Sequence, residues 1–257
     1  GMSTSNPLFT DSDNGDYTLQ QSSPAIDAGN PDLDGDGTIW SSDTDDQDPD
    51  GTRMDMGAYY FHQVPAIQPD GTGTSNDPYL ISTLNNLSWL SQNSSKWDKY
   101  YKQTANIDAS ATQYWDDSDD NSDGDKYNDT NDKSSTGNDE GFSPIGNSTT
   151  KFTGTYDGDG YVIDRLKIVR SSTNYIGLFG FTNGGNIQNL GITNGNISGG
   201  SWVGCLVGTN KYSTLNNSYV TGTVTGSSNI GGLAGENENS NIIDCYTIGI
   251  VLGSDPN

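Results

Sequence analysis

A repeat of 27 or 28 residues in the second half of the chain constrains the fold more than any other feature. Residues 177–180 (Gly-Leu-Phe-Gly) return as residues 205–208 and again as residues 232–235, at offsets of 28 and 27. A second marker follows each copy at the same two offsets, and its copies begin at Asn186, Thr214 and Asn241. A fixed period of this size is typical of solenoids, whereas propeller blades usually take about 40 residues or more.

Each period holds about three short strands between glycine or asparagine corners, which is too little to bury its own apolar face. If the repeats stack as coils of a parallel β-helix, equivalent strands pair about 4.8 Å apart and residues such as Leu206 and Leu233 stack inward. We expect the corner glycines Gly180, Gly208 and Gly235 to need positive φ or close backbone approach. An earlier, divergent copy at residues 162–168 aligns with residues 186–192 at an offset of 24.

Several glycine-rich runs in this half also carry a family resemblance. The run Phe152-Thr-Gly-Thr-Tyr-Asp-Gly-Asp-Gly precedes Ile176-Gly-Leu-Phe-Gly, Val203-Gly-Cys-Leu-Val-Gly and Ile230-Gly-Gly-Leu-Ala-Gly. Together they resemble GLUG-motif repeats, which occur in bacterial adhesins and beside the protease domain of some immunoglobulin A1 peptidases. The resemblance covers about residues 71–257. It implies an all-β, right-handed parallel β-helix in an extracellular setting and says little about a ligand.

The region before the repeats predicts one short helix. Leu84, Leu87 and Leu90 recur every three residues after Ser82 and Thr83, which are good N-cap residues. An amphipathic helix here would cover the open apolar end of the first coil and block edge pairing. We therefore expect the cap and first strands at residues 74–110, including an early strand at 100–107, and the repeats proper at residues 151–257.

The N-terminal residues follow a different pattern. The segments Ser23-Pro-Ala-Ile-Asp-Ala-Gly and Met54-Asp-Met-Gly-Ala-Tyr-Tyr resemble the closing segment of another secreted parallel β-helix. We therefore predict a separate module at residues 1–63, a proline-rich linker at 64–73 and the main β-helix at 74–257.

Acidic residues are concentrated in two loops. The chain has 34 acidic and 11 basic residues, giving a net charge of −23, which disfavours binding to nucleic acid or anionic lipid. Residues 32–55 and the predicted insertion at 116–140 hold 19 of the 34 acidic side chains. Charge alone does not separate cation binding from a merely solvating surface.

The first acidic loop has the spacing of a calcium site. Calcium needs six to eight oxygen ligands, and alternating Asp residues before a turn glycine wrap carboxylates around one centre. The loop resembles those of EF-hands and dockerins, although Asp rather than Glu closes it and no flanking helices are evident. The predicted calcium ligands are Asp32, Asp34, Asp36, Thr38 and Asp43. A weaker match, alternatively only a surface insertion, is formed by Asp119, Asn121, Asp123 and Asp125.

Catalytic residue patterns are sparse. His62 is the only histidine, so neither a His-based triad nor an HExxH zinc site can be assembled. Cys205 and Cys245 lack the paired spacing of a metal or redox site, and we expect two small buried thiols.

Carbohydrate chemistry is harder to exclude. A basic cluster near the first coil could serve a calcium-assisted lyase, although ordinary surface charge is the commoner explanation; it comprises Arg165, Lys167 and Arg170. Tryptophans could form sugar-stacking platforms where exposed, with Trp202 beside a repeat corner, or could pack the cap and loops; the others are Trp40, Trp89, Trp97 and Trp115.

The leading hypothesis is a non-catalytic structural or adhesive module of a secreted or cell-surface bacterial protein, stabilised by calcium. Its expected partners are an extracellular glycan, a host or cell-surface protein and neighbouring domains of a longer chain. A carbohydrate-active β-helix, either a lyase or a hydrolase, or a carbohydrate-binding module is the alternative, and a pure spacer is a third. A catalytic β-helix predicts a lateral cleft lined with carboxylates, whereas a flat Asn/Ser/Thr face argues against it.

Overall fold

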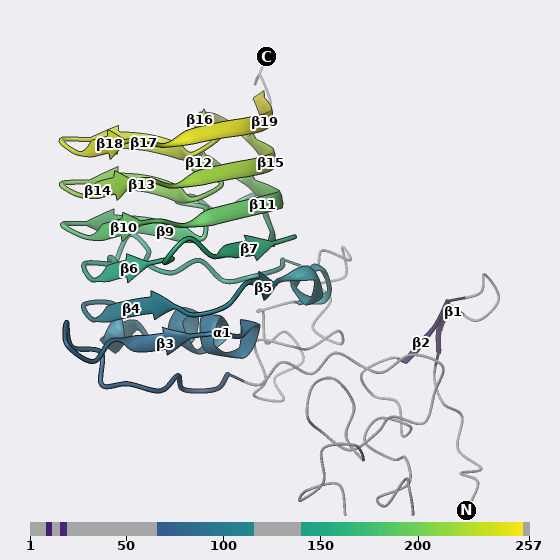
Figure 1. Ribbon diagram of the computed structural model, residues 1–257. Coiled ribbons are helices and arrows are strands. Elements are labelled where there is room, and N and C mark those ends of the chain that lie inside the picture. The colour runs from purple at the N-terminus through teal and green to yellow at the C-terminus, as the bar shows by residue number, and fades with distance from the viewer. Residues whose placement is uncertain (1–8, 12–15, 20–65, 116–139, 254–257) are drawn as a thin grey trace, which may run out of the picture. The chain divides into compact units, whose positions relative to one another are not determined.

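The computed structural model describes residues 9–11, 16–19, 66–115 and 140–253. The chain divides into two units, Gly1–Val64 with Ser118–Lys133 and Pro65–Asp117 with Ser134–Asn257. In the first unit, β1 (Phe9–Asp11) and β2 (Asp16–Leu19) pair antiparallel. The second unit is a parallel β-solenoid of about four turns, stacked in Figure 1 from β3 to β19. The predicted parallel β-helix is therefore confirmed.

One six-stranded sheet is built from short strands, in the order β18-β14-β10-β6-β4-β3, with parallel neighbours throughout. Its strands are β3 (Tyr79–Ile81), β4 (Tyr100–Gln103), β6 (Thr155–Asp157), β10 (Asn186–Gln188), β14 (Thr214–Asn216) and β18 (Asn241–Ile243). One inward column follows the register through Tyr79, Tyr101, Tyr156, Ile187, Leu215 and Ile242. All of these are buried except Ile242, in the last described coil.

A second sheet forms a long flank of the solenoid, in the order β19-β15-β11-β7-β5, and β8 also pairs with β11. Its strands are β5 (Ile107–Asp108), β7 (Val162–Asp164), β8 (Lys167–Arg170), β11 (Gly191–Gly199), β15 (Tyr219–Gly226) and β19 (Tyr246–Gly253). The side chains of Val220 and Val224 point into the core, so the immediate neighbours of each along β15 point outward.

Two smaller parallel sheets complete each coil. They comprise β9 (Phe179–Asn183), β13 (Val207–Lys211) and β17 (Ala234–Glu238), and β12 (Ser201–Gly204) with β16 (Ser228–Gly231). Leu206 between β12 and β13 is fully buried, as predicted for an inward ladder. Leu233, its equivalent in the last coil, is only half-buried.

The structure confirms the repeat but corrects its first copy. Asn186, Thr214 and Asn241 are register partners, as the two offsets predicted. The alignment of residues 162–168 at an offset of 24 is wrong, because Val162 pairs with Gly191, 29 residues later. Residues 162–168 and 186–192 look alike because each stretch holds two short apolar strands around a corner, but in the fold β6 pairs with β10 and β7 pairs with β11, so the hydrophobic pattern alone did not fix the register.

The glycines predicted to lie at corners are instead the second residues of strands β9, β13 and β17, and they are required by close backbone approach rather than by positive φ. A Cβ on Gly180 would lie 2.4 Å from the Gly146 oxygen, and one on Gly208 would lie 2.5 Å from the Gly180 oxygen. Neither residue has a positive φ. Left-handed corners are instead filled by stacked non-glycine residues, which we call the corner row: Asn189 (φ 54°), Asn217 (φ 45°) and Asp244 (φ 51°). Asn and Asp tolerate this region better than other side chains do.

The predicted helix is present as α1 (Leu84–Gln92). Thr83 is its N-cap, and Asn86 completes a capping box with it. The three leucines are buried, and Trp89 packs edge-on against Tyr79 of β3 with ring centroids 5.3 Å apart. Two 3₁₀ helices follow, η2 (Ser94–Lys96) and η3 (Ser110–Tyr114). The early strand expected at 100–107 is two strands, β4 and β5, because the chain turns a corner between them.

Removing side-chain volume from the inward ladder tests the solenoid core. We expect Leu206→Ala to lower the free energy of unfolding by about 2–5 kcal/mol, because the buried leucine leaves a cavity between coils. The matched variant Leu252→Ala, at a side chain that is 51% exposed, should cost less than about 1 kcal/mol. Urea unfolding followed by circular dichroism measures both, and equal losses would contradict the register.

Candidate functional site

The predicted calcium ligands lie outside the described residues. This applies to Asp32, Asp34, Asp36, Thr38 and Asp43, and to Asp119, Asn121, Asp123 and Asp125. Within residues 66–115 and 140–253, no group of three or more His, Cys, Asp or Glu side chains could hold a metal ion. The calcium site therefore stays a prediction from the sequence.

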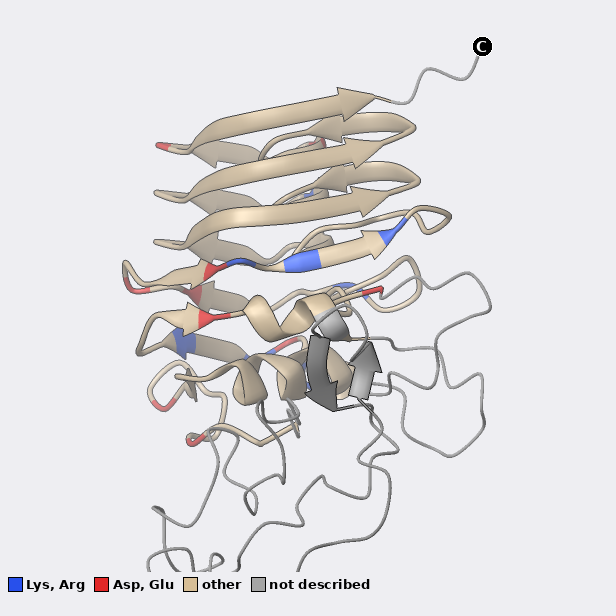
Figure 2. Ribbon diagram, turned by 90° about the vertical axis from the view of Figure 1, so that its right-hand side faces the viewer, with Lys and Arg blue, Asp and Glu red and all other residues tan. Residues whose placement is uncertain are grey.

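The most extended surface feature of the described solenoid is an uncharged flank, here called the lateral face. It is formed by the outward residues of β11, β15 and β19, which are Thr193, Asn196, Ser198, Thr221, Thr223, Thr225, Ile248, Ile250 and Leu252. These three strands contain no charged residue, whereas Figure 2 shows charged residues gathered on the earlier coils. The face offers hydroxyl and amide groups on two strands and an aliphatic row on the third.

The lateral face also carries an aromatic pair. Tyr219 and Tyr246 stack with ring centroids 5.2 Å apart and planes 6° from parallel. Tyr219 covers Gly191 in the coil below, where a Cβ would lie 2.7 Å from the tyrosine ring. The arrangement suits contact with an uncharged partner, and β11, β15 and β19 place no carboxylate, imidazole or amine on this face.

The predicted basic cluster does not form one site. Arg165 pairs with Asp108 at 2.7 Å and with Asp164 at 3.1 Å on the exposed surface. Lys167 donates to the carbonyl oxygen of Gln113 at 3.1 Å. These contacts tie each cation to its own neighbouring segment, so they supply no shared binding centre.

Arg170, the third member of that cluster, is buried. Its guanidinium pairs with Glu140 at 3.0 Å and donates to the Gly141 carbonyl oxygen at 3.2 Å. The side chain is 8% exposed, so it anchors the preceding segment at residues 140–142, where Gly141 bridges to Ile168 of β8. Replacing one partner of such a buried pair is costlier than removing an exposed one.

A polar network at one corner was missed by the sequence reasoning. Asn217 donates through Nδ2 to Asn189 Oδ1 at 2.8 Å, and Asn189 donates through Nδ2 to Asp157 Oδ1 at 2.9 Å. Gln188 donates to the other oxygen of Asp157 at 2.8 Å. The available signal was an Asn recurring at the repeat period, which marks stacked amides as well as turns.

The electrostatics of this network centre on Asp157. Partial burial by itself would raise the pKa of Asp157. Hydrogen bonds from Asn189, from the Asp159 backbone N–H and from Gln188 favour the carboxylate, with help from nearby Lys102, and the net effect lowers the pKa. Asp157 is thus held ionised as a hydrogen-bond acceptor, the opposite of a proton donor poised for catalysis.

The predicted aromatic platform is reduced to one pair at a corner. Trp202 stacks on Tyr175 with centroids 4.8 Å apart and planes 10° from parallel, and both side chains are half-buried. The ring centroid of Phe181 lies 5.4 Å from that of Tyr175. The other described tryptophans are buried and pack the cap and the first coils: Trp89, Trp97 and Trp115. Trp40 lies outside the described residues.

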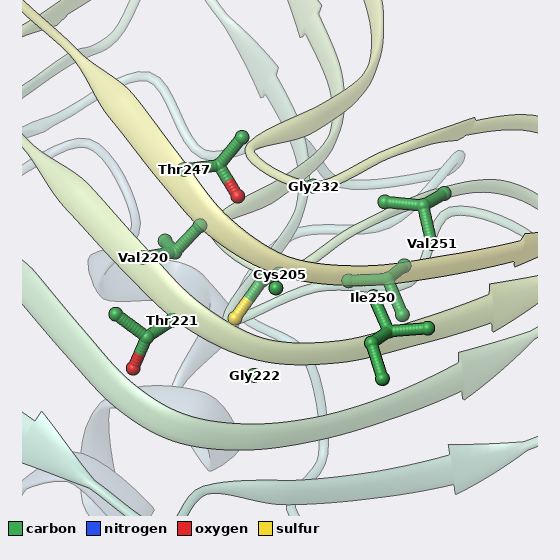
Figure 3. A pocket seen from close by; sticks show the side chains of 10 residues that line it. Cys205, Val220, Thr221, Gly222, Gly232, Thr247, Ile250 and Val251 are labelled. Carbon is green, nitrogen blue, oxygen red and sulfur yellow. The ribbon is translucent and has the colours of Figure 1, made fainter.

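A small pocket lies beside Cys205 and is lined by Gly222 of β15 and by Thr247, Gly249 and Ile250 of β19, among others (Figure 3). The cavity volume is about 10 Å³, which is room for about one water molecule and too little for a sugar ring. Burial raises the pKa of the Cys205 thiol to about 12, so the thiol stays protonated at neutral pH and is a poor nucleophile.

The second cysteine departs from its prediction. Cys245 is half-buried rather than buried, and its Sγ donates to the Ile243 carbonyl oxygen at 3.1 Å. Ser218 occupies the equivalent position one coil earlier and donates to the Asn216 carbonyl oxygen at 2.8 Å. Cys245 therefore replaces a corner serine and forms no disulfide.

The pH dependence of stability tests the role of Asp157. A lowered native pKa stabilises the fold above the usual carboxyl pKa of 3.8, and this stability is lost as the pH falls through the lowered native value. The stability difference between the wild type and Asp157→Asn should therefore be largest at neutral pH and shrink in acid. Urea midpoints across this range measure it. Asn217→Ala, which removes a non-titrating amide of the same network, should give a difference that does not shrink.

Comparison with known proteins supports the fold more than a function. No family model matches the chain. It is 37% identical over 143 residues to halomucin of Haloquadratum walsbyi (strain DSM 16790 / HBSQ001), a match that covers 54% of this chain and 1% of halomucin. The crystal structure of a "putative immunoglobulin A1 protease" from Bacteroides ovatus superposes with a TM-score of 0.50 and 24% identity, over 70% of this chain and 49% of that one. This likeness shows the parallel solenoid fold alone.

Proposed function

We propose that the solenoid is a non-catalytic structural and adhesive module of a secreted or cell-surface protein. The observation that carries the proposal is the uncharged lateral face, a sheet flank covered by threonine, serine and asparagine and bordered by an aliphatic row. Similarity to a segment of halomucin, whose name describes a mucin, supports the location. We also propose that the coils are GLUG-type repeats, on the motifs at residues 176–180, 203–208 and 230–235.

The stacked coils suit a projecting element. Each coil adds about 4.8 Å along the axis and pairs its backbone with both neighbours, so length grows without a change in cross-section. Hydroxyl and amide groups on the lateral face can hydrogen-bond an uncharged glycan or the polar surface of a protein. A partner that approached the acidic loops would meet strong negative charge, whereas this flank presents none.

A carbohydrate-active enzyme is the alternative, and the described residues favour it less. The three basic side chains point to separate partners, and Asp157 is held as an acceptor within a polar network. The stacked Tyr175–Trp202 pair is the observation that keeps a carbohydrate-binding role as a second candidate, because half-exposed aromatic rings are suited to sugar contact.

A paired assay separates adhesion from catalysis. Cells that display the parent protein should lose attachment to glycan- or matrix-coated surfaces when Thr221, Thr223 and Ile250 are all replaced by Asp, because the uncharged lateral face would then carry three negative charges. The matched triple variant Asn76→Asp, Ser171→Asp and Asn229→Asp adds the same three negative charges at exposed neutral positions elsewhere. Release of reducing ends or unsaturated sugars from acidic polysaccharides incubated with the wild-type protein would overturn the non-catalytic proposal.

We propose that calcium stabilises the module through the loop from Asp32 to Asp43. Saturating calcium should raise the free energy of unfolding by roughly 2–3 kcal/mol at about a hundredfold excess over the dissociation constant. Isothermal titration calorimetry should show a binding heat that disappears in the double variant Asp34→Asn/Asp36→Asn. The control Asp98→Asn, at an exposed acid outside both loops, should retain it. An unchanged melting temperature after chelation would reject the proposal.

A further inference from the structure

We propose that Asn147 is an acceptor for an N-linked oligosaccharide. Asn147, Ser148 and Thr149 form the triplet Asn-x-Thr that asparagine-linked glycosylation uses, in which the middle residue is not proline. All four residues from 147 to 150 are exposed. The inference is independent of the calcium site and of the lateral face, because the triplet lies on neither.

The turn leaves the reactive nitrogen of Asn147 accessible. The Asn147 backbone N–H donates to the Thr150 carbonyl oxygen at 2.7 Å. Asn147 Oδ1 accepts the backbone N–H groups of Thr149 and Thr150, each at 2.9 Å. The carboxamide oxygen is thus held against the turn, while Nδ2 has no hydrogen-bond partner among the described residues and lies on the opposite side of the carboxamide.

Anchors on both sides present this turn as a fixed protrusion. Before the turn, the Ile145 N–H donates to the Leu178 carbonyl oxygen at 2.9 Å, and after it the Phe152 N–H donates to the Phe181 carbonyl oxygen at 2.9 Å. Lys151 donates to the Ser148 carbonyl oxygen at 2.6 Å and lies 5.6 Å from the centroid of the Phe181 ring. A modification at the tip therefore leaves the core undisturbed.

The other such triplets in the described part of the chain are less suitable. Asn86 is buried and belongs to the capping box of α1, and Asn93 donates through Nδ2 to the Trp89 carbonyl oxygen at 2.8 Å. Asn196 and Asn216 lie within β11 and β14, each paired with a strand on both sides. A transferase would have to pull a strand out of its sheet to bind those triplets, whereas the triplet at Asn147 is already outside the strands.

The chemistry requires a polyprenyl-diphosphate-linked oligosaccharide and its transferase as co-reactants. Asn147 Nδ2 attacks the anomeric carbon of the first sugar, forming a C–N bond. The C–O bond to the diphosphate breaks, and the polyprenyl diphosphate leaves with that electron pair. The amide nitrogen gives up one proton to a base, so no oxidation or reduction occurs.

Site occupancy can be read from one peptide. Trypsin cleavage after Lys133 and Lys151 releases residues 134–151, in which Asn147 begins the only acceptor triplet. Protein secreted by cells that glycosylate a co-expressed reporter should yield this peptide with added glycan mass on Asn147 in more than about half of the molecules. Thr149→Ser, which keeps the triplet, should retain the glycan, whereas Thr149→Ala and Asn147→Gln should abolish it.

Asn93→Gln is the matched control, because it removes another acceptor triplet, one whose Asn93 side-chain amide is already hydrogen-bonded. This variant should keep the full glycan mass at Asn147. A bare Asn147 in cells where the reporter is fully glycosylated would overturn the proposal, as would a glycan found on Asn196 or Asn216 while Asn147 is unmodified. Circular dichroism of Asn147→Gln should match the wild type, since the replaced side chain is exposed.

Discussion

Hydrogen bonding between successive coils in a fixed register is the constraint on which the rest of the structure depends. In the later coils it places each residue directly above its equivalent 27 or 28 residues earlier, so every position must tolerate a copy of itself about 4.8 Å away. Apolar residues meet this condition easily and form the inward columns. Tyrosines meet it by stacking, as in the Tyr219–Tyr246 pair, and asparagines meet it by passing hydrogen bonds from one coil to the next.

The same register explains where glycine is needed and where it is not. Within the strands, glycine is needed where two backbones approach closely, as between Gly180 of β9 and Gly208 of β13. At the left-handed corners, Asn or Asp occupies the position instead of glycine. The repeat thus places glycine and Asn or Asp at two kinds of position with different requirements, although both look like turn residues in the sequence.

The repeat was enough to predict the parallel solenoid and its inward ladders, and the leucine spacing after the N-cap Thr83 was enough to predict the capping helix, because these depend on periodicity and on local capping chemistry. The register of the first coil was not predictable in this way. Between Asp157 and Val162 the chain takes a longer corner, so the offset differs from that of the later coils while the apolar pattern still matches elsewhere. The polar network at Asp157 also required the fold, since its members become neighbours only when the coils stack. The calcium loop remains a matter of spacing alone.

The corner row has a consequence for how such repeats can change. Asn189 and Asn217 lie between Asp157 and Asp244, so carboxylates do not follow one another in adjacent coils at this corner. Where two carboxylates are register partners, at Asp108 and Asp164, Arg165 pairs with both. Two unneutralised carboxylates one coil apart would repel by about 1 kcal/mol in water and by more where solvent is partly excluded. Whether the corner residue is Asn or Asp therefore limits which coils can be neighbours along the solenoid axis. A gene duplication that copied a coil ending in Asp onto itself would be penalised at this corner unless a second substitution or a bound cation accompanied it.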